Sequence, residues 1–139
     1  MGTYIFKADR EHERYIGWTS VCDAPTWWTD SREEALAQMQ RDADPWLRDD
    51  APHHPIQRLK RVDENGTSAC WEDMPIESNP GHWSDEDILW MEGSPERDGG
   101  SWSIPRQNLW EVCQALDPMT GRPTRDITDL LTWNPWDES

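Results

Sequence analysis

The histidines are the first residues whose type and spacing could support chemistry, and two of them, His53 and His54, are adjacent. Adjacent side chains point in different directions, and no third ligand lies at a spacing that is typical of zinc sites. Prolines flank the pair, which favours an exposed loop. A third histidine, His82, precedes an acidic triplet at positions 85–87, but this stretch lacks the glycine and the alternating oxygen ligands of a calcium loop. The sequence therefore predicts no metal site and no cofactor.

The three cysteines, Cys22, Cys70 and Cys113, are far apart in the sequence and lie in no nucleophile or ligand motif. Cysteine is among the most commonly buried residue types, so we expect Cys22 and Cys113 to pack in the core. Gly99 and Gly100 are not followed by the lysine and hydroxyl residue of a phosphate-binding loop. Pairs of carboxylates arise by chance in a chain with 28 acidic residues. The pattern therefore favours a protein that is not an enzyme.

The charge balance restricts the partners of the chain, because 28 acidic residues against 13 basic ones give a formal net charge of -15. Such a charge repels phosphate, so direct binding of nucleic acid over a broad surface is not expected. Anionic membranes are disfavoured for the same reason. A basic protein partner would be attracted, and the attraction should weaken with salt because the Debye length is about 8 Å at physiological ionic strength.

The aromatic content is the second unusual feature, since the 139-residue chain has eleven tryptophans but one phenylalanine and two tyrosines. Tryptophan is enriched among the residues that dominate binding energy at protein interfaces. Our leading hypothesis is a non-catalytic module that binds a basic protein through carboxylates and exposed tryptophans, with imitation of DNA as one version. The residues that we expect to contact the partner are Trp27, Trp28, Trp46, Trp83, Asp85, Glu86 and Asp87.

A second hypothesis belongs to another class: a pocket for a sugar or nucleotide that is lined by tryptophans, in a ligand-binding or enzyme domain. Aromatic walls with a few convergent polar groups are typical of such pockets. The loop histidines and His82 would then supply polar contacts. Three or more tryptophans around one concave site, with a histidine inside it, would favour this hypothesis over the interface.

The chain should fold as one domain, because 139 residues suffice for a core and the tryptophans offset a hydrophobic content of only 35%. Strand-forming residues at 3–8 and 15–20 flank a charged loop and predict a hairpin. Ser31 and Glu34 form a capping box ahead of an amphipathic pattern that predicts a helix over 32–42. We expect one of Trp27 and Trp28 to be buried beside this helix and the other to be exposed at the rim.

The rest of the chain predicts shorter elements. Residues 44–55 should be an irregular connection, and Asn65-Gly66 predicts a hairpin turn between 56–63 and a strand over 67–71 whose Trp71 packs across the sheet. The remaining expected elements are a central strand at 88–91, a turn at 93–100, a helix from Pro105 to Leu116, a short helix that Asp126 caps and Leu131 ends, and a turn-like tail at 133–136. The fold class is α+β, with a small antiparallel sheet of about four to five strands and two or three helices.

Two stretches of the sequence carry a resemblance. Tyr4-Ile5-Phe6-Lys7-x-Asp9-Arg10, followed by Tyr15-x-x-Trp18 and Ala24-Pro25-Thr26, resembles small uncharacterised proteins of actinobacteria and their phages, and Arg58 to Ala69 resembles a second block of that group. The resemblance implies a stand-alone domain in a bacterial or phage cytoplasm, and it carries over no activity. The start of the chain has no apolar signal segment, and no apolar run approaches the roughly 20 residues of a membrane span, which also favours the cytoplasm.

Overall fold

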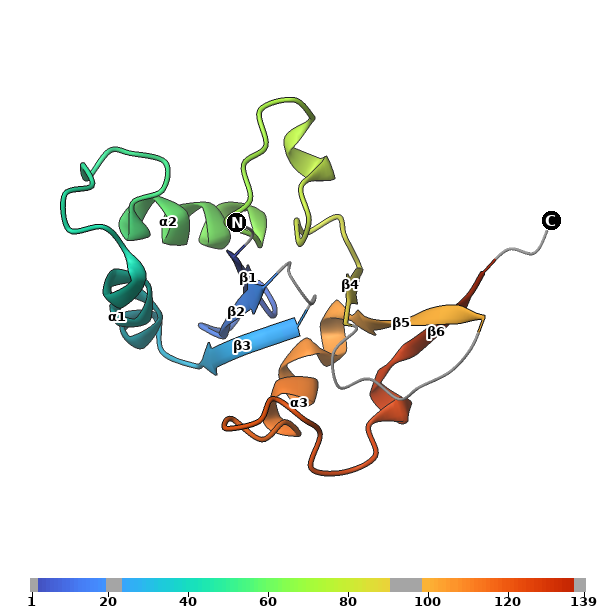
Figure 1. Cartoon of the computed structure of the whole chain (residues 1–139). Helices are drawn as coiled ribbons and strands as arrows, with labels where there is room; N and C mark the ends of the chain where they lie inside the picture. Colours follow the sequence, from blue (N-terminus) through green and yellow to red (C-terminus); the bar gives the residue numbers. More distant parts are fainter. Residues whose placement is uncertain (1–2, 20–23, 91–98, 137–139) are drawn as a thin grey trace.

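Two small antiparallel sheets and three helices make up an α+β domain in the computed structural model, which describes residues 3–19, 24–90 and 99–136 (Figure 1). The first sheet has the order β1-β2-β3 and the second has the order β4-β5-β6. The strands are β1 (Thr3–Lys7), β2 (Tyr15–Thr19), β3 (Ala24–Thr29), β4 (Asp87–Leu89), β5 (Gly100–Pro105) and β6 (Thr132–Pro135). Each described sheet has three strands, so the expected single sheet of four to five strands is wrong.

The first helix and its cap confirm the sequence prediction. Helix α1 spans Arg32–Asp42, and the Ser31 side chain accepts a hydrogen bond from the Glu34 backbone N–H at 3.2 Å. The other half of the capping box closes through Thr29, whose hydroxyl donates to Glu34 Oε2 at 3.1 Å and accepts from the Ser31 N–H at 3.2 Å. The carboxylate therefore reaches the cap through one intervening hydroxyl.

The second helix replaces an expected hairpin. Helix α2 spans Pro55–Asn65, with His54 as its N-cap and Gly66 as its C-cap in the left-handed conformation, at φ +84°. Its buried residues include Leu59 and Val62, which lie three positions apart and so share one face of the helix. The Asn65-Gly66 pair ends a helix here. Trp71, expected on a strand after the turn, lies outside the strands and is exposed.

The C-terminal half differs from the sequence prediction in its strands. Pro105 ends β5, and a short 3₁₀ turn at Arg106–Asn108 leads into helix α3 (Leu109–Gln114). The predicted apolar face of this helix is buried: Leu109, Val112, Cys113 and Leu116. Residues 132–135 form β6 because they pair with β5, so the turn-like tail is wrong.

The remaining predictions for this half hold in part. Asp126 caps a 3₁₀ turn at Thr128–Leu130 by accepting from the Thr128 N–H at 3.0 Å. The predicted strand at 88–91 appears as β4, but at the edge of its sheet. The turn predicted at 93–100 falls mostly outside the described residues.

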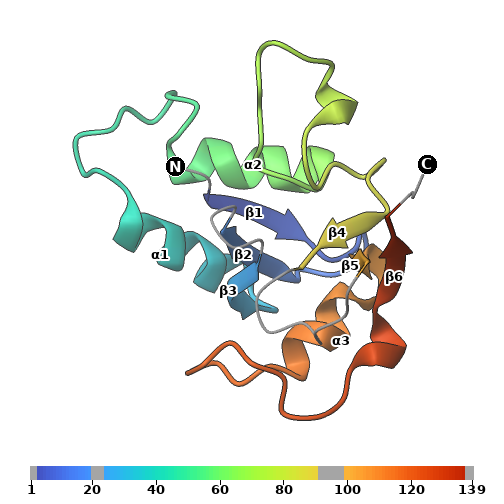
Figure 2. The ribbon, with the colours of Figure 1, turned by 45° about the vertical axis from the view of Figure 1, so that its right-hand side comes forward.

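The first sheet lies in the middle of the molecule, with helices α1 and α2 on one face and the second sheet with α3 on the other (Figures 1 and 2). Alternate residues of its strands therefore enter two separate cores. Ile5 and Tyr15 pack with α1 and α2 around Leu59. Phe6 and Ile16 pack with the second sheet and α3, in a larger cluster that also holds Trp90.

The paired tryptophans follow this alternation. Trp27 packs against the core under α1 and α2, whereas Trp28 packs against the larger core on the opposite face. Both side chains are only partly buried, so the expected division into one buried and one exposed indole is wrong. Neighbouring residues of a strand point to opposite faces, and here each face is covered.

Gly17 makes room for the Trp27 indole, and its replacement is the first testable prediction. A Cβ atom at Gly17 would lie 2.2 Å from Trp27 Nε1, so Gly17→Ala must displace the ring. We expect a loss of about 1–3 kcal/mol in the free energy of unfolding, measured by urea denaturation. In a Trp27→Ala background the same substitution should cost almost nothing. An equal loss in both backgrounds would contradict this close approach.

Candidate protein-interaction face

The structure brings together four of the residues predicted to contact a partner. Trp83, Asp85, Glu86 and Asp87 follow one another in the stretch that leads into β4. The other three lie elsewhere: Trp27 and Trp28 are partly buried against the two cores, and Trp46 is 89% exposed in the connection between α1 and α2. A single surface containing the whole predicted set is therefore not formed.

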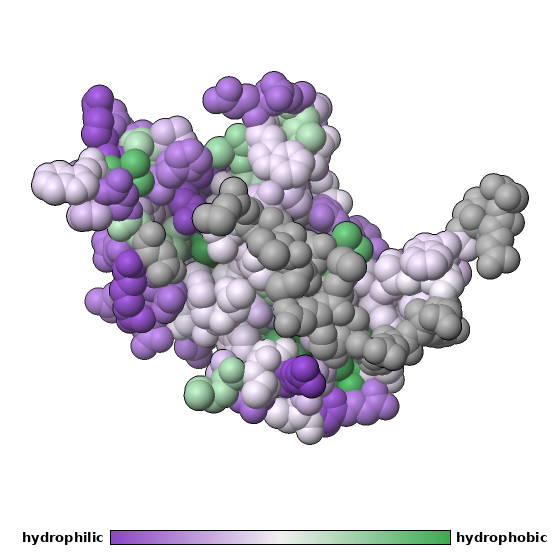
Figure 3. Space-filling model, in the orientation of Figure 1, coloured by the Kyte–Doolittle hydropathy of each residue, from purple (hydrophilic) through white to green (hydrophobic). Residues whose placement is uncertain are grey.

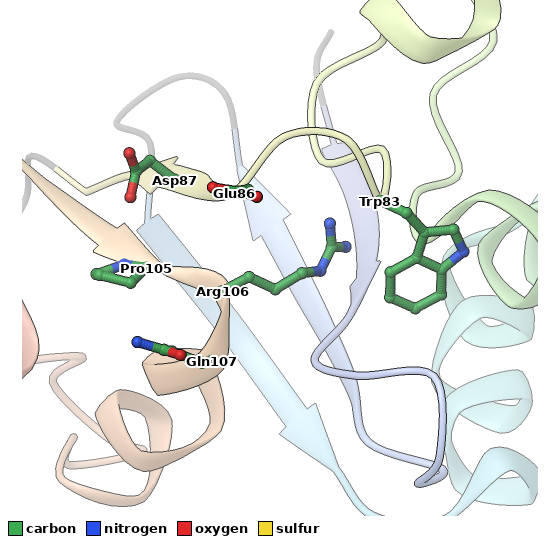
Figure 4. A pocket seen from close by; sticks show the side chains of 6 residues that line it. All are labelled: Trp83, Glu86, Asp87, Pro105, Arg106 and Gln107. Carbon is green, nitrogen blue, oxygen red and sulfur yellow. The ribbon is translucent and has the colours of Figure 1, made fainter.

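Arg106, which no sequence motif marks, extends toward Trp83 in this region (Figure 4). Its guanidinium donates from Nε to Lys7 O at 3.1 Å, from Nη1 to His82 O at 2.8 Å and from Nη2 to Gly66 O at 2.8 Å. It also lies over the Trp83 ring, 4.6 Å from the centroid. One side chain thus joins β1, the end of α2 and the stretch before β4.

Burial lowers the pKa of Arg106 to about 10, while the nearby Asp85 carboxylate acts in the opposite direction. The guanidinium therefore keeps its proton at neutral pH and donates to the three carbonyls as a cation. Asp85 itself accepts from the Gly81 N–H at 3.2 Å through Oδ2. Both side chains thus serve the local structure.

The Trp83 side chain is fixed by contacts within the protein. Its indole N–H donates to Glu64 O at 3.0 Å, and its ring contacts a second guanidinium, that of Arg10, 4.8 Å from the centroid. Cation–π contacts of this kind contribute about 0.5–2 kcal/mol each. This indole fixes the end of α2 against the stretch before β4, so we assign it a structural role.

An open pocket of about 340 Å³ lies beside this assembly (Figure 4). Its lining is Trp83, Glu86, Asp87, Pro105, Arg106 and Gln107. The Arg106 guanidinium points toward Trp83, whereas Glu86 and Asp87 are exposed. The charge that this pocket offers to a partner is therefore negative.

A smaller pocket of about 100 Å³ lies between β1, β2 and β4, and it is mainly apolar. Its lining is Tyr4, Phe6, Trp18, Pro80, Gly81, Asp85, Ile88 and Leu89. Gly81, at φ +83°, lets the chain pass close to the Phe6 ring, since a Cβ atom there would lie 2.2 Å from that ring. The 79–85 stretch can therefore form one wall of this pocket.

A projecting segment next to this pocket exposes apolar side chains among acids. The apolar residues are Trp71, Met74 and Ile76, and the exposed fraction of the Trp71 side chain is 48%. The exposed acids beside them are Glu72, Asp73 and Glu77. In Figure 3 the segment projects at the top of the view, with hydrophilic and hydrophobic residues side by side.

Asn79, which is 2% exposed, holds this segment in shape. Its Oδ1 accepts from the Trp71 N–H at 2.8 Å and its Nδ2 donates to Ile76 O at 3.0 Å. The Ser84 hydroxyl donates to Glu77 O at 2.7 Å and so ties the segment to the stretch before β4. A buried amide that is bonded on both sides makes the segment preorganised.

These parts adjoin one another. The Trp71 ring lies 6.5 Å from that of Tyr4, and Tyr4 lines the small pocket together with Leu89, which is exposed at 52%. We define the acidic face as the exposed apolar residues and the exposed acids of this region: Trp71, Met74, Ile76 and Leu89 with Glu72, Asp73, Glu77, Glu86 and Asp87.

Among the histidines and cysteines, His54 and Cys113 have roles in the fold. His54 Nδ1 accepts from the Ile56 N–H at 3.2 Å and so caps α2, and His53 is exposed. Burial raises the pKa of the Cys113 thiol far above its ordinary value. Cys70 is exposed, and Cys22 lies outside the described residues. Within residues 3–19, 24–90 and 99–136, no cluster of three or more histidine, cysteine or acidic side chains is arranged to hold a metal.

The described helices are all too short or too polar to cross a membrane. No protein-family model, no curated protein and no solved structure matches the chain. The resemblance to small proteins of actinobacteria and their phages therefore stays an expectation from the sequence.

Proposed function

We propose that this protein is a non-catalytic module that binds a basic protein partner through the acidic face. The observation that carries the proposal is the preorganised segment around Asn79, which holds Trp71, Met74 and Ile76 out of the core and among exposed acids. Ordering such side chains costs conformational free energy during association, and a segment already fixed before binding avoids much of that cost. A partner therefore gains from apolar anchors that are already in place.

The charge of the face supports a basic partner. Its exposed acids neighbour the apolar residues along the chain, and protein interfaces usually combine apolar contacts with polar residues. The net charge of -15 would steer a basic surface toward the molecule and raise the association rate. A DNA-binding protein is one such partner, in which case the carboxylates would take the positions of phosphates. The resemblance in the sequence adds a bacterial or phage cytoplasm as the setting.

The two described pockets give less support to a ligand enclosed by tryptophans. Each pocket is lined by a single tryptophan, Trp83 in one and Trp18 in the other, and neither is lined by a histidine. The hypothesis of a sugar or nucleotide site requires several indoles around one cavity. We therefore favour the interface.

The test begins with capture of partners from a bacterial lysate at about 50 mM and about 500 mM salt, a range over which screening changes strongly. The partner retained at low salt and released at high salt is purified, and its affinity is measured by calorimetry. We expect Trp71→Ala to weaken binding by at least about 30-fold, because central interface tryptophans contribute 2 kcal/mol or more. Thermal melting should be nearly unchanged, since the indole is half exposed.

Two matched variants serve as controls. Met119→Ala removes a side chain that is 91% exposed in another loop, and Glu111→Lys reverses an exposed charge on α3. Both should bind within about twofold of the parent if the acidic face is the docking surface. Recovery of no basic protein at low salt, or full affinity in Trp71→Ala, would overturn the proposal.

A further inference from the structure

Among the described residues, no strand pairs with the outer edge of β4, and this edge lies beside the small apolar pocket. β4 is an outer strand of the second sheet and pairs only with β5 among the described strands. Its partners in register are Pro105 for Asp87 and Ser103 for Leu89. The direction in which each backbone group points follows from this register.

In an antiparallel pair, hydrogen-bonded positions alternate with positions whose backbone groups point outward. The Arg106 N–H donates to Glu86 O at 2.8 Å, so the backbone groups of positions 86 and 106 point toward each other. Asp87 and Pro105 are then a non-hydrogen-bonded pair, which fits the missing N–H of proline. Leu89 and Ser103 follow as the next such pair, so the N–H and C=O of Asp87 and Leu89 face away from β5.

In contrast, the outer edge of β1 is covered by another segment of the chain. There the Lys7 N–H donates to Gly66 O at 3.0 Å, and the Ser68 N–H donates to Ile5 O at 2.9 Å. The segment that follows α2 thus covers β1. Within the ranges that the structure describes, no segment pairs with the outer edge of β4.

We propose that the outer edge of β4 accepts an extended basic segment of the partner as an added strand, with one apolar side chain of that segment in the small pocket. This proposal rests on the proposed function and names the form of the partner at the same face. Strand addition of this kind draws affinity from main-chain hydrogen bonds and specificity from pockets for alternate side chains.

The pocket fits one apolar side chain. Ile88 and Leu89 of β4 line it together with Tyr4, Phe6 and Trp18, so it lies beside the strand. Its volume of about 100 Å³ is smaller than the roughly 150 Å³ cavity that holds benzene. A branched aliphatic residue is therefore the right size for it.

The carboxylates at the start of β4 indicate that the other side chains of the bound segment are basic. Glu86 and Asp87 are exposed at the start of β4, and the guanidinium that lines the open pocket with them, that of Arg106, already donates to three carbonyls. Lysine or arginine on the added strand would face these carboxylates. A second copy of this chain would bring like charges together, which is destabilising across paired strands. The occupant is therefore a basic partner rather than another copy.

The experiment uses synthetic eight-residue peptides and amide spectra of the intact protein. The probe alternates lysine and valine, and we expect it to shift the amide signals of Asp87 and Leu89 and to slow their hydrogen exchange. A lysine–serine peptide of equal charge should bind at least about tenfold more weakly, because it leaves the pocket empty. A glutamate–valine peptide should not bind.

Backbone pairing is tested separately from charge. Methylation of the peptide nitrogens in the lysine–valine probe removes the donors and keeps the charge, and it should abolish the Asp87 and Leu89 shifts. In the protein, Leu89→Pro removes an outward N–H that β5 does not use, and proline is tolerated at such edges. Equal binding of the methylated and unmethylated peptides would overturn strand addition.

The outcomes separate the two proposals. A partner that depends on Trp71 and leaves the amides of Asp87 and Leu89 unchanged would sustain the proposed function and overturn strand addition. If the peptide binds at β4 but the capture experiment recovers no basic partner, the proposed function is overturned and strand addition is sustained.

Discussion

Arg106→Ala is expected to lower the free energy of unfolding by more than about 3 kcal/mol. The substitution removes three charge-assisted hydrogen bonds, those to the carbonyls of Lys7, Gly66 and His82, and it removes one guanidinium from the Trp83 ring. Hydrogen bonds to charged groups contribute about 1.5–3 kcal/mol each, although such terms are not additive. Urea denaturation at pH 7 measures the loss.

Two variants test the reason for this loss. Arg106→Lys keeps the charge but cannot place three donors in the geometry of a planar fork, so an intermediate loss is expected. Arg122→Ala removes an exposed arginine and should change stability by less than about 0.5 kcal/mol. If lysine restored the full stability, charge rather than the fork would explain the role of Arg106.

Trp90→Ala is expected to cost about 3–5 kcal/mol, which is the usual range for removal of a large aromatic side chain from a core. Trp90 is 0% exposed and lies in the larger core between the two sheets. Its indole N–H has no hydrogen-bond partner in the part of the chain that the structure describes. An unpaired buried donor itself costs about 1–3 kcal/mol, which the native packing must offset.

That unpaired donor makes a second substitution informative. Trp90→Phe removes the N–H and keeps much of the apolar volume, so its loss should be well below that of alanine. Trp46→Ala, at an exposed position, should be nearly neutral and is the matched control. Equal losses for Trp90→Phe and Trp90→Ala in thermal melts would show that the indole N–H is satisfied in solution.

The sequence predicted correctly those elements that are specified by residues close together in the chain. The Ser31 cap and the periodic apolar residues after it specify α1, and the buried face of α3 follows from spacing alone. The Asn65-Gly66 pair misled the prediction because glycine in the left-handed conformation serves a hairpin turn and a helix C-cap equally well. Leu59 and Val62, three residues apart and followed by that glycine, were the signal for α2.

Long-range contacts explain the features that could not be predicted. β6 forms because it pairs with β5, about thirty residues earlier, and nothing within residues 132–135 marks it as a strand. Arg106 donates to backbone carbonyls of three distant segments. Every residue has such a carbonyl, so the residue types do not reveal which ones accept a hydrogen bond. In the candidate site the acidic triplet was identified, whereas the exposed Trp71 depends on the buried Asn79 and was missed.

The separation of the two cores has a consequence for synthesis on the ribosome. The described residues of the core beneath α1 and α2 all lie between Ile5 and Val62, so that half of the molecule can pack once α2 has emerged. The larger core also requires residues up to Leu130. Until those are translated, the opposite face of the first sheet, with Phe6, Ile16 and Trp18, is uncovered in the nascent chain. During that interval we expect the growing polypeptide to be a substrate for chaperones that bind apolar strands.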